Sequence, residues 1–166
     1  MATFKKVGYG QVEPNHLSAQ RNGQIYAQLP CAADTKILEN GQFVKYDYAN
    51  NVVNTTGDGE WMLVYNEVKL YDARETAKDF AMKKTAYDNG IIVPRVFKTM
   101  VGDIFTTNCI AGADAEEGLA LEVGEDLKIN ANGFLAKDGT SAEVFQIVKI
   151  YTMPDGSDGV KVMRTK

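Results

Sequence analysis

The sequence predicts a mainly β protein, a sandwich or barrel-like β domain, and three features of its pattern support this prediction. Short runs of aromatic and β-branched residues recur along the chain, and turn-forming Asn, Asp and Gly residues separate them. The segment 41–66 shows the pattern most clearly, as strand, turn, strand, turn, strand. A related layout returns 83 residues later, in the segment 124–147. We therefore expect two β-meander units.

Two origins of this internal similarity are open. Nine positions of the first unit align with nine of the second, and three of the nine pairs are identical. An ancient duplication and two independent strand-turn-strand solutions both explain such a match, and the low identity slightly favours the second. The aligned positions are Gly41, Val44, Lys45, Tyr46, Asp47, Val52, Glu60, Met62 and Val64, which match Gly124, Leu127, Lys128, Ile129, Asn130, Leu135, Glu143, Phe145 and Ile147.

The N-terminal residues lack the periodicity of either a strand or a helix. Residues 9–16 contain glycine and proline and alternate poorly, which predicts an extended N-terminal arm over residues 1–23. Residues 24–29 alternate well enough for a strand that Pro30 ends. Further strands are expected over residues 43–47, 51–54 and 60–66, with turns at their Asn and Gly residues.

One short helix is expected over residues 73–84. This segment consists of good helix formers and ends in two lysines, which suit a helix C-terminus. Its apolar stripe is narrow, so the helix should lie on a sheet. The predicted organisation is an arm over residues 1–23 and a β domain over residues 24–166. An alternative is two β subdomains, about 24–72 and 91–166, which this helix joins.

The C-terminal third has the clearest strand pattern. Strands are expected within residues 96–107, with a break at Gly102 and Asp103, and then over 119–123, 126–130, 134–136, 143–153 and 159–164. Asn132 and Gly133 lie between apolar flanks, which is a strong hairpin signal.

Composition excludes several classes of protein. The chain has 166 residues and a net charge of -4, which argues against direct nucleic-acid binding because such proteins normally carry a basic face. The start lacks the apolar core of a signal peptide, and no apolar run approaches the roughly eighteen residues that span a membrane. We therefore expect no membrane contact and synthesis in the cytosol of the producing cell, with Cys31 and Cys109 as reduced thiols.

No motif predicts a catalytic residue, a metal site or a cofactor. His16 is the single histidine, and a loop-pinning role is the simpler interpretation because a catalytic base needs an oriented partner. The Asp and Gly residues of 155–159 miss the spacing of a calcium loop and suit a hairpin loop instead. Trp61 lies in a strand with two apolar faces, which favours core packing over stacking on a sugar.

Several stretches resemble a family of head-associated proteins of tailed bacteriophages. They are residues 6–21 (KVGYGQVEPNHLSAQR), 23–30 (GQIYAQLP), 41–61, 93–103 (VPRVFKTMVGD) and 148–156 (VKIYTMPDG). The resemblance implies a non-enzymatic capsid decoration or auxiliary head protein on the virion surface. It also implies the major capsid protein as partner, and assembly as a homo-trimer or binding as a monomer.

If this resemblance holds, the arm is the expected docking element, because aromatic rings and guanidinium groups are favoured anchors at interfaces. The candidate docking residues are Tyr9, Pro14, His16, Leu17 and Arg21. Two alternatives are open. A carbohydrate- or receptor-binding virion module would expose Trp61 or a tyrosine cluster, and a small hydrolase would bring His16 or paired carboxylates into a pocket.

Overall fold

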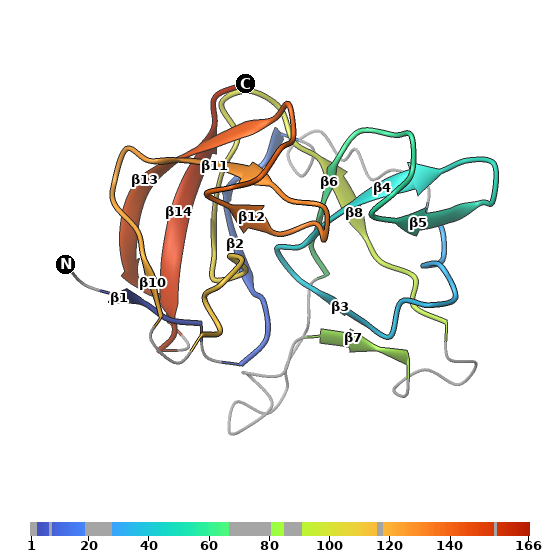
Figure 1. Cartoon of the computed structure of the whole chain (residues 1–166), viewed down its shortest axis with the longest axis horizontal. Helices are drawn as coiled ribbons and strands as arrows, with labels where there is room; N and C mark the ends of the chain where they lie inside the picture. The colour runs from blue at the N-terminus through green and yellow to red at the C-terminus, as the bar shows by residue number, and fades with distance from the viewer. Residues whose placement is uncertain are drawn as a thin grey trace.

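The computed structural model describes residues 3–6, 8–18, 28–66, 81–84, 91–115, 118–154 and 156–166, and the regular secondary structure of this part of the chain is almost entirely β-strand (Figure 1). The strands are β1 (Thr3–Phe4), β2 (Val12–His16), β3 (Ile37–Glu39), β4 (Phe43–Asp47), β5 (Val52–Asn54), β6 (Met62–Val64), β7 (Ala81–Lys83), β8 (Val96–Lys98), β9 (Ile104–Thr107), β10 (Leu119–Ala120), β11 (Asp126–Ile129), β12 (Leu135–Ala136), β13 (Val144–Thr152) and β14 (Asp158–Arg164).

The strands form four antiparallel sheets. A six-stranded sheet has the order β12-β11-β13-β14-β9-β2, and a four-stranded sheet has the order β5-β4-β6-β8. Two smaller sheets pair β1 with β10 and β3 with β7. The mainly β prediction is confirmed. Both large sheets are open at their ends, so the architecture is sandwich-like and not a closed barrel.

Two hydrophobic cores hold the sheets together. Alternation along β11 and β14 places Leu127, Ile129 and Val162 in the first core, where they pack with Phe105 and Phe145. The second core lies among β3, β4, β5, β6 and β8. The two units, residues 41–66 and 124–147, share the first core, because Phe43, Trp61 and Leu63 of the first unit also lie in it.

Two aromatic residues show how this joint is made. The ring of Phe43 lies 5.3 Å from that of Phe145, and the Phe43 amide donates a 2.6 Å hydrogen bond to the Gly133 carbonyl. Trp61 is 9% exposed and belongs to the same core, which confirms the expected core packing.

The two predicted units have the same topology, but neither is a simple meander. In both units the first strand lies between the second and the third, as the orders β5-β4-β6 and β12-β11-β13 show. The reason is the connection between the second and third strands, residues 55–61 and 137–143, which is long enough to return past the first strand. The meander prediction is therefore wrong about strand order.

Equivalent backbone hydrogen bonds form within each unit, and the corresponding residues of the two units are 83 positions apart in the sequence. The Gly41 amide donates to the Val64 carbonyl at 2.9 Å, and the Gly124 amide donates to the Ile147 carbonyl at 2.8 Å. The hydrogen bonds in the opposite direction also correspond. The Val64 amide donates to the Gln42 carbonyl at 2.9 Å, and the Ile147 amide donates to the Glu125 carbonyl at 2.8 Å.

A side-chain contact repeats as well. The Glu39 amide donates to Gln42 Oε1 at 3.2 Å, as the Glu122 amide does to Glu125 Oε2 at 2.8 Å. Gly41 and Gly124 also share a left-handed backbone, with φ of 89° and 94°. Because independent hairpins have no reason to share these details, the structure favours the duplication.

The predicted helix over residues 73–84 is wrong in its last turn, where Ala81–Lys83 form β7. These residues pair with β3, and Met82 enters the second core opposite Leu38. The cause is tertiary: pairing and burial of one side chain outweigh the helix propensity of three residues. Residues 73–80 of the prediction lie outside the described residues, as do residues 24–27 of the strand expected over 24–29.

The N-terminal residues are extended, but the prediction of a separate arm is wrong. β1 pairs with β10, β2 forms the sixth strand of the large sheet, and Phe4 and Leu17 lie in the first core. An irregularity between Glu13 and His16, together with Pro14, breaks the alternation of β2, as an edge strand tolerates. Residues 19–23 lie outside the described residues.

Candidate docking surface

The end of β2 and the turn that precedes β9 form a continuous surface at one end of the large sheet. We call residues 99–103 the apical turn. His16, the last residue of β2, lies opposite Ile104, the first residue of β9, so the apical turn and the end of β2 are neighbours.

Asp103 holds the apical turn from inside. This carboxylate is 1% exposed; its Oδ1 accepts the Ser18 amide at 2.9 Å and also the Ser18 hydroxyl. Its Oδ2 accepts the Met100 amide at 2.8 Å. The Asp103 amide closes the turn on the Met100 carbonyl at 2.9 Å, and Gly102 supplies the required positive φ of 92°. The turn is thereby fixed to the chain that leaves β2.

Arg164 holds the same turn from the C-terminal strand. Its Nη1 donates to the Thr99 carbonyl and, at 3.1 Å, to the Thr99 hydroxyl. The Gly102 amide donates to the Arg164 carbonyl at 2.8 Å, and the Arg164 amide donates to the Asp103 carbonyl at 2.9 Å. Two separate parts of the chain therefore fix this backbone.

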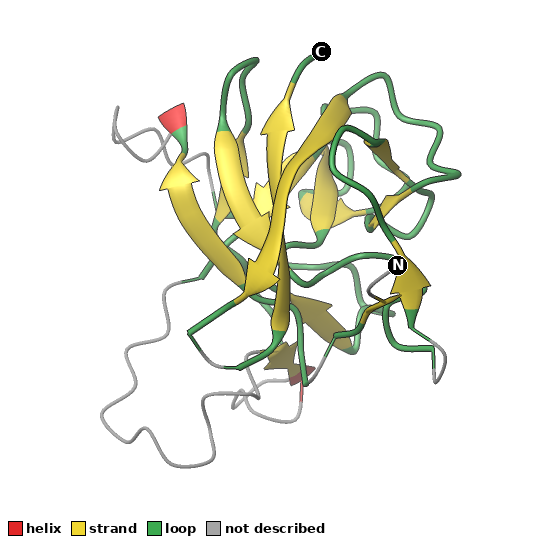
Figure 2. Ribbon diagram, turned by 90° about the vertical axis from the view of Figure 1, so that its left-hand side faces the viewer, coloured by secondary structure: helices red, strands yellow, loops and turns green. Residues whose placement is uncertain are grey.

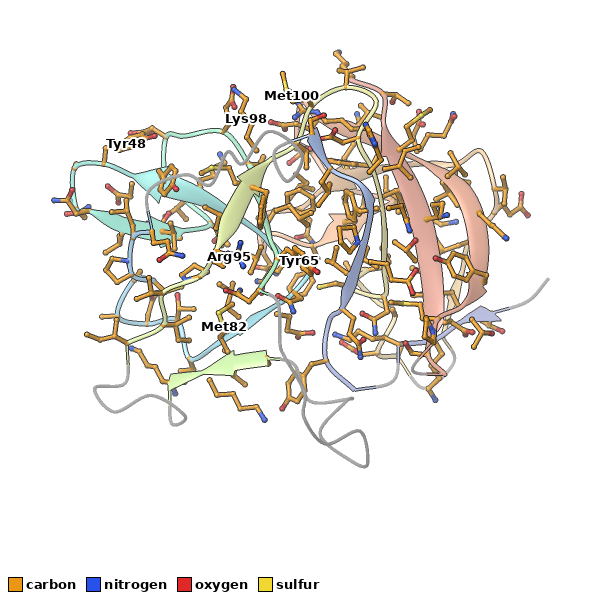
Figure 3. The ribbon with its side chains drawn as sticks, turned by 180° about the vertical axis from the view of Figure 1, so that it is seen from behind. Tyr48, Tyr65, Met82, Arg95, Lys98 and Met100 are labelled. Atoms are coloured by element: carbon orange, nitrogen blue, oxygen red, sulfur yellow. The ribbon has the colours of Figure 1, made fainter. Side chains whose placement is uncertain are left out.

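The tip of the apical turn presents two apolar side chains to solvent. Met100 is 49% exposed and Val101 is 67% exposed, and Figure 3 shows Met100 on the rim of the molecule. A fixed backbone that presents exposed apolar groups loses little conformational entropy when a partner covers it. This combination is typical of a docking element.

The surface continues from the apical turn onto the outer face of the large sheet, which Figure 2 turns toward the viewer. We define the outer face as the side of β13, β14, β9 and β2 that points away from the first core. Strand register places these residues on it: Glu13, His16, Ile104, Thr106, Lys149, Tyr151, Lys161 and Met163.

Tyr151 connects the two sides of this face. Its hydroxyl donates to Glu13 on β2, and the Thr106 hydroxyl lies 2.8 Å from the phenol oxygen. Thr106 also donates to Asn15 Oδ1 at 2.7 Å. Burial, and then the Glu13 carboxylate, raise the pKa of Tyr151, so the phenol is protonated at neutral pH and can donate this bond.

The structure brings together only part of the predicted docking set. Pro14 and His16 lie on β2, and His16 is exposed beside the apical turn. Leu17 is 2% exposed and belongs to the first core, so it is not available for docking. Tyr9 is half-buried beneath the Lys83 ammonium, which lies 4.4 Å from its ring centre. Arg21 lies outside the described residues.

Sequence reasoning missed Met100, Val101 and Asp103. Their signal was a pair of large apolar residues directly before Gly102 in a strand break, a place where turns are usually polar. The hydrogen-bond partner of Asp103, Ser18, lies 85 residues away in sequence, so no local pattern indicates it.

A second polar centre lies under the N-terminal segment. Lys6 Nζ is 2.8 Å from Glu39 Oε2 and 3.4 Å from Asp114 Oδ1. Burial alone lowers the pKa of Lys6, but Glu39, Cys109 and Asp114 together raise it, so the amine is charged. Burial raises the pKa of the Cys109 thiol. This centre joins the N-terminal segment to the first unit.

Two cavities lined by residues that the structure describes offer room for a small ligand. One, of about 370 Å³, lies between the units and is lined by Lys45, Glu60, Trp61 and Glu143, among others. The Lys45 ammonium lies over the Trp61 ring, with its nitrogen 4.7 Å from the ring centre. The lysine therefore occupies the position that a sugar stacked on this ring would take. The other, of about 180 Å³, is lined by Cys31, Leu38 and Val53, among others. His16 lines neither of these two cavities, so they give it no catalytic setting.

Within the described ranges, no group of three or more His, Cys, Asp or Glu residues could hold a metal ion. Nor does any helix in those ranges have the length and apolar character to cross a membrane. The chain matches no protein-family model, no curated protein and no solved structure.

Proposed function

We propose that this protein is a non-enzymatic virion component that binds the outer surface of an assembled phage head and stabilises it. The proposed partner is the major capsid protein. A protein that binds only the assembled shell stabilises that shell by mass action. The proposal starts from the resemblance of residues 6–21, 93–103 and 148–156 to head-associated phage proteins, and all three stretches contribute to the candidate docking surface.

The apical turn is the observation that supports docking most directly. Met100 and Val101 are exposed, while the buried Asp103 carboxylate and the half-buried Arg164 fix the backbone beneath them. Exposed His16 adds a polar group at the same end of the sheet. Apolar anchors within a polar rim are the usual anatomy of a protein interface.

This assignment revises the docking residues expected from the sequence. His16 and Pro14 are retained, Met100 and Val101 are added, and Leu17 is removed because it is buried. A truncation of residues 1–21 would not test this assignment cleanly, because it would remove Phe4 and Leu17 from the first core. Point substitutions on the surface are required instead.

The test compares two valines of nearly equal exposure. Val101→Ser changes the apical turn, and Val123→Ser changes the connection between β10 and β11, in which Val123 is 64% exposed. Each purified variant is co-sedimented with assembled heads of the encoding phage. We expect saturable binding of the wild type and of Val123→Ser, and binding on the order of tenfold weaker for Val101→Ser, since interface anchors commonly contribute more than about 1 kcal/mol.

Absence of wild-type binding to heads would refute the proposal, and a glycan array would then test the carbohydrate-binding alternative. Equal binding of the two valine variants would remove the apical turn from the docking surface.

A further inference from the structure

A pair of lysines on the outer face has an unfavourable arrangement that a partner would relieve. Lys149 on β13 and Lys161 on β14 lie directly opposite each other in the sheet. Like charges in such a cross-strand pair repel, and the pair destabilises the sheet. The repulsion occurs in a chain whose net charge is -4, so carboxylates are not scarce.

No carboxylate in the described part of the chain forms an ion pair with either lysine. The ion pairs found there use Lys6, Lys98 and Lys137. Glu13 lies in the same row of the outer face, two strands from Lys161, but it accepts the Tyr151 hydroxyl. Both ammonium groups instead lie against the Tyr151 ring, 5.3 Å and 5.6 Å from its centre.

We propose that Lys149, Tyr151 and Lys161 form a binding patch for carboxylates on an acidic protein surface. This inference rests on the proposed function, in which the acidic surface belongs to the head shell. Two cations beside an aromatic ring suit such a partner, because tyrosine supplies contact area and the lysines supply charge complementarity. Tyr151 is already fixed by Glu13 and Thr106, so its ring needs no ordering on binding.

Protein carboxylates fit this patch better than nucleic-acid phosphates. Glu13 and Asp126 lie on the same side of the large sheet, and both would repel a continuous phosphate backbone. Nucleic-acid binding normally uses a dense basic stripe, whereas this patch holds two lysines.

The test is the double variant Lys149→Gln/Lys161→Gln. Its matched control is Lys5→Gln/Lys36→Gln, which removes the same charge from two other exposed lysines. Urea unfolding first verifies that both variants are folded. With assembled heads we expect binding on the order of tenfold weaker for the patch variant and a shallower dependence on salt, with the control within about twofold of wild type.

The outcomes separate this inference from the proposed function. If the wild type binds heads and the patch variant binds equally well, the patch is refuted and the function stands. If the wild type does not bind heads, the function is refuted, and titration with poly-L-glutamate then decides the patch: weaker binding by the patch variant supports it, and no difference refutes it. Tighter binding of a short DNA duplex than of poly-L-glutamate at equal salt, lost in the patch variant, would also refute the carboxylate assignment.

Discussion

Replacement of Asp103 by alanine should loosen the apical turn and lower the stability of the whole protein. The carboxylate is buried and accepts three hydrogen bonds, from the Ser18 amide, the Ser18 hydroxyl and the Met100 amide. Alanine leaves all three donors without this acceptor. It also releases the tie between the end of β2 and the turn before β9.

The size of the effect follows from these contacts. A hydrogen bond to a charged group contributes about 1.5–3 kcal/mol, so three bonds set an upper limit of about 9 kcal/mol. Ser18 is half-buried and its donors regain water in the variant, and alanine also avoids the desolvation of a carboxylate. We therefore expect a loss of about 3 kcal/mol in the free energy of unfolding, which corresponds to about 6–12 °C in Tm for a chain of this length.

Urea unfolding followed by tryptophan fluorescence measures this loss, because Trp61 lies in the first core. The control is Asp138→Ala, an exposed aspartate that should change stability by less than about 0.5 kcal/mol. A loss below about 1 kcal/mol for Asp103→Ala, or an equal loss in the control, would show that the carboxylate does not hold the turn. At a temperature where the variant is still folded, its binding to heads should fall along with that of Val101→Ser.

Four further predictions follow from other contacts. Glu39→Gln should lower the free energy of unfolding by about 3 kcal/mol, because it removes the 2.8 Å ion pair of the buried Lys6 ammonium and leaves the largely exposed Asp114 carboxylate, 3.4 Å away, as its charged partner. The double variant Lys6→Met/Glu39→Leu should lose less, and equal losses would contradict this reasoning. Gly133→Ala should lower the free energy of unfolding by at least about 2 kcal/mol more than Gly124→Ala. Both glycines have positive φ, but only at Gly133 would a Cβ overlap the Phe43 carbonyl oxygen. Equal melting temperatures of the two variants would refute this close approach. The pKa of Tyr151 is raised above its ordinary value of 10.0, so the contribution of its proton to stability is complete below pH 10 and is lost as pH rises through the folded-state pKa. The stability of Tyr151→Phe, measured in urea from about pH 8 to 11, should therefore fall less than that of wild type above about pH 10, and parallel curves would exclude this linkage. Burial raises the pKa of Cys31 to about 12 and also raises that of Cys109. Neither thiol should therefore react with a disulfide reagent at about pH 8 until urea unfolds the chain. Rapid reaction of either thiol in the folded protein would show that it is accessible.

The sequence was most informative where structure depends on neighbouring residues. The strands expected over 126–130, 134–136, 143–153 and 159–164 correspond closely to β11, β12, β13 and β14. Alternation of buried and exposed side chains is a local property of a strand, and the Asn and Gly residues of the turns are local as well. The offset of 83 residues between the units is likewise a property of the residue order alone.

Predictions failed where a distant partner decides the conformation. Residues 81–83 have helix-forming neighbours, yet they form β7 because β3, more than forty residues earlier, pairs with them. The sequence of β2 predicted an arm because Pro14 and the irregularity between Glu13 and His16 hide the alternation of its side chains. The segment is a strand because it pairs with β9, about ninety residues later. Low identity slightly favoured independent units, whereas shared hydrogen bonds favour a duplication.

The candidate docking surface depends on the same distinction. Sequence alone determined the mainly β class, most strands of the second unit, and the apolar character of Met100 and Val101. Only the tertiary structure placed Ser18 and Arg164 around the apical turn, buried Leu17, and set Lys149 opposite Lys161. The physical reason is that side-chain pattern and turn chemistry act over a few residues, whereas strand register, burial and hydrogen-bond partners arise from contacts between segments far apart in the chain.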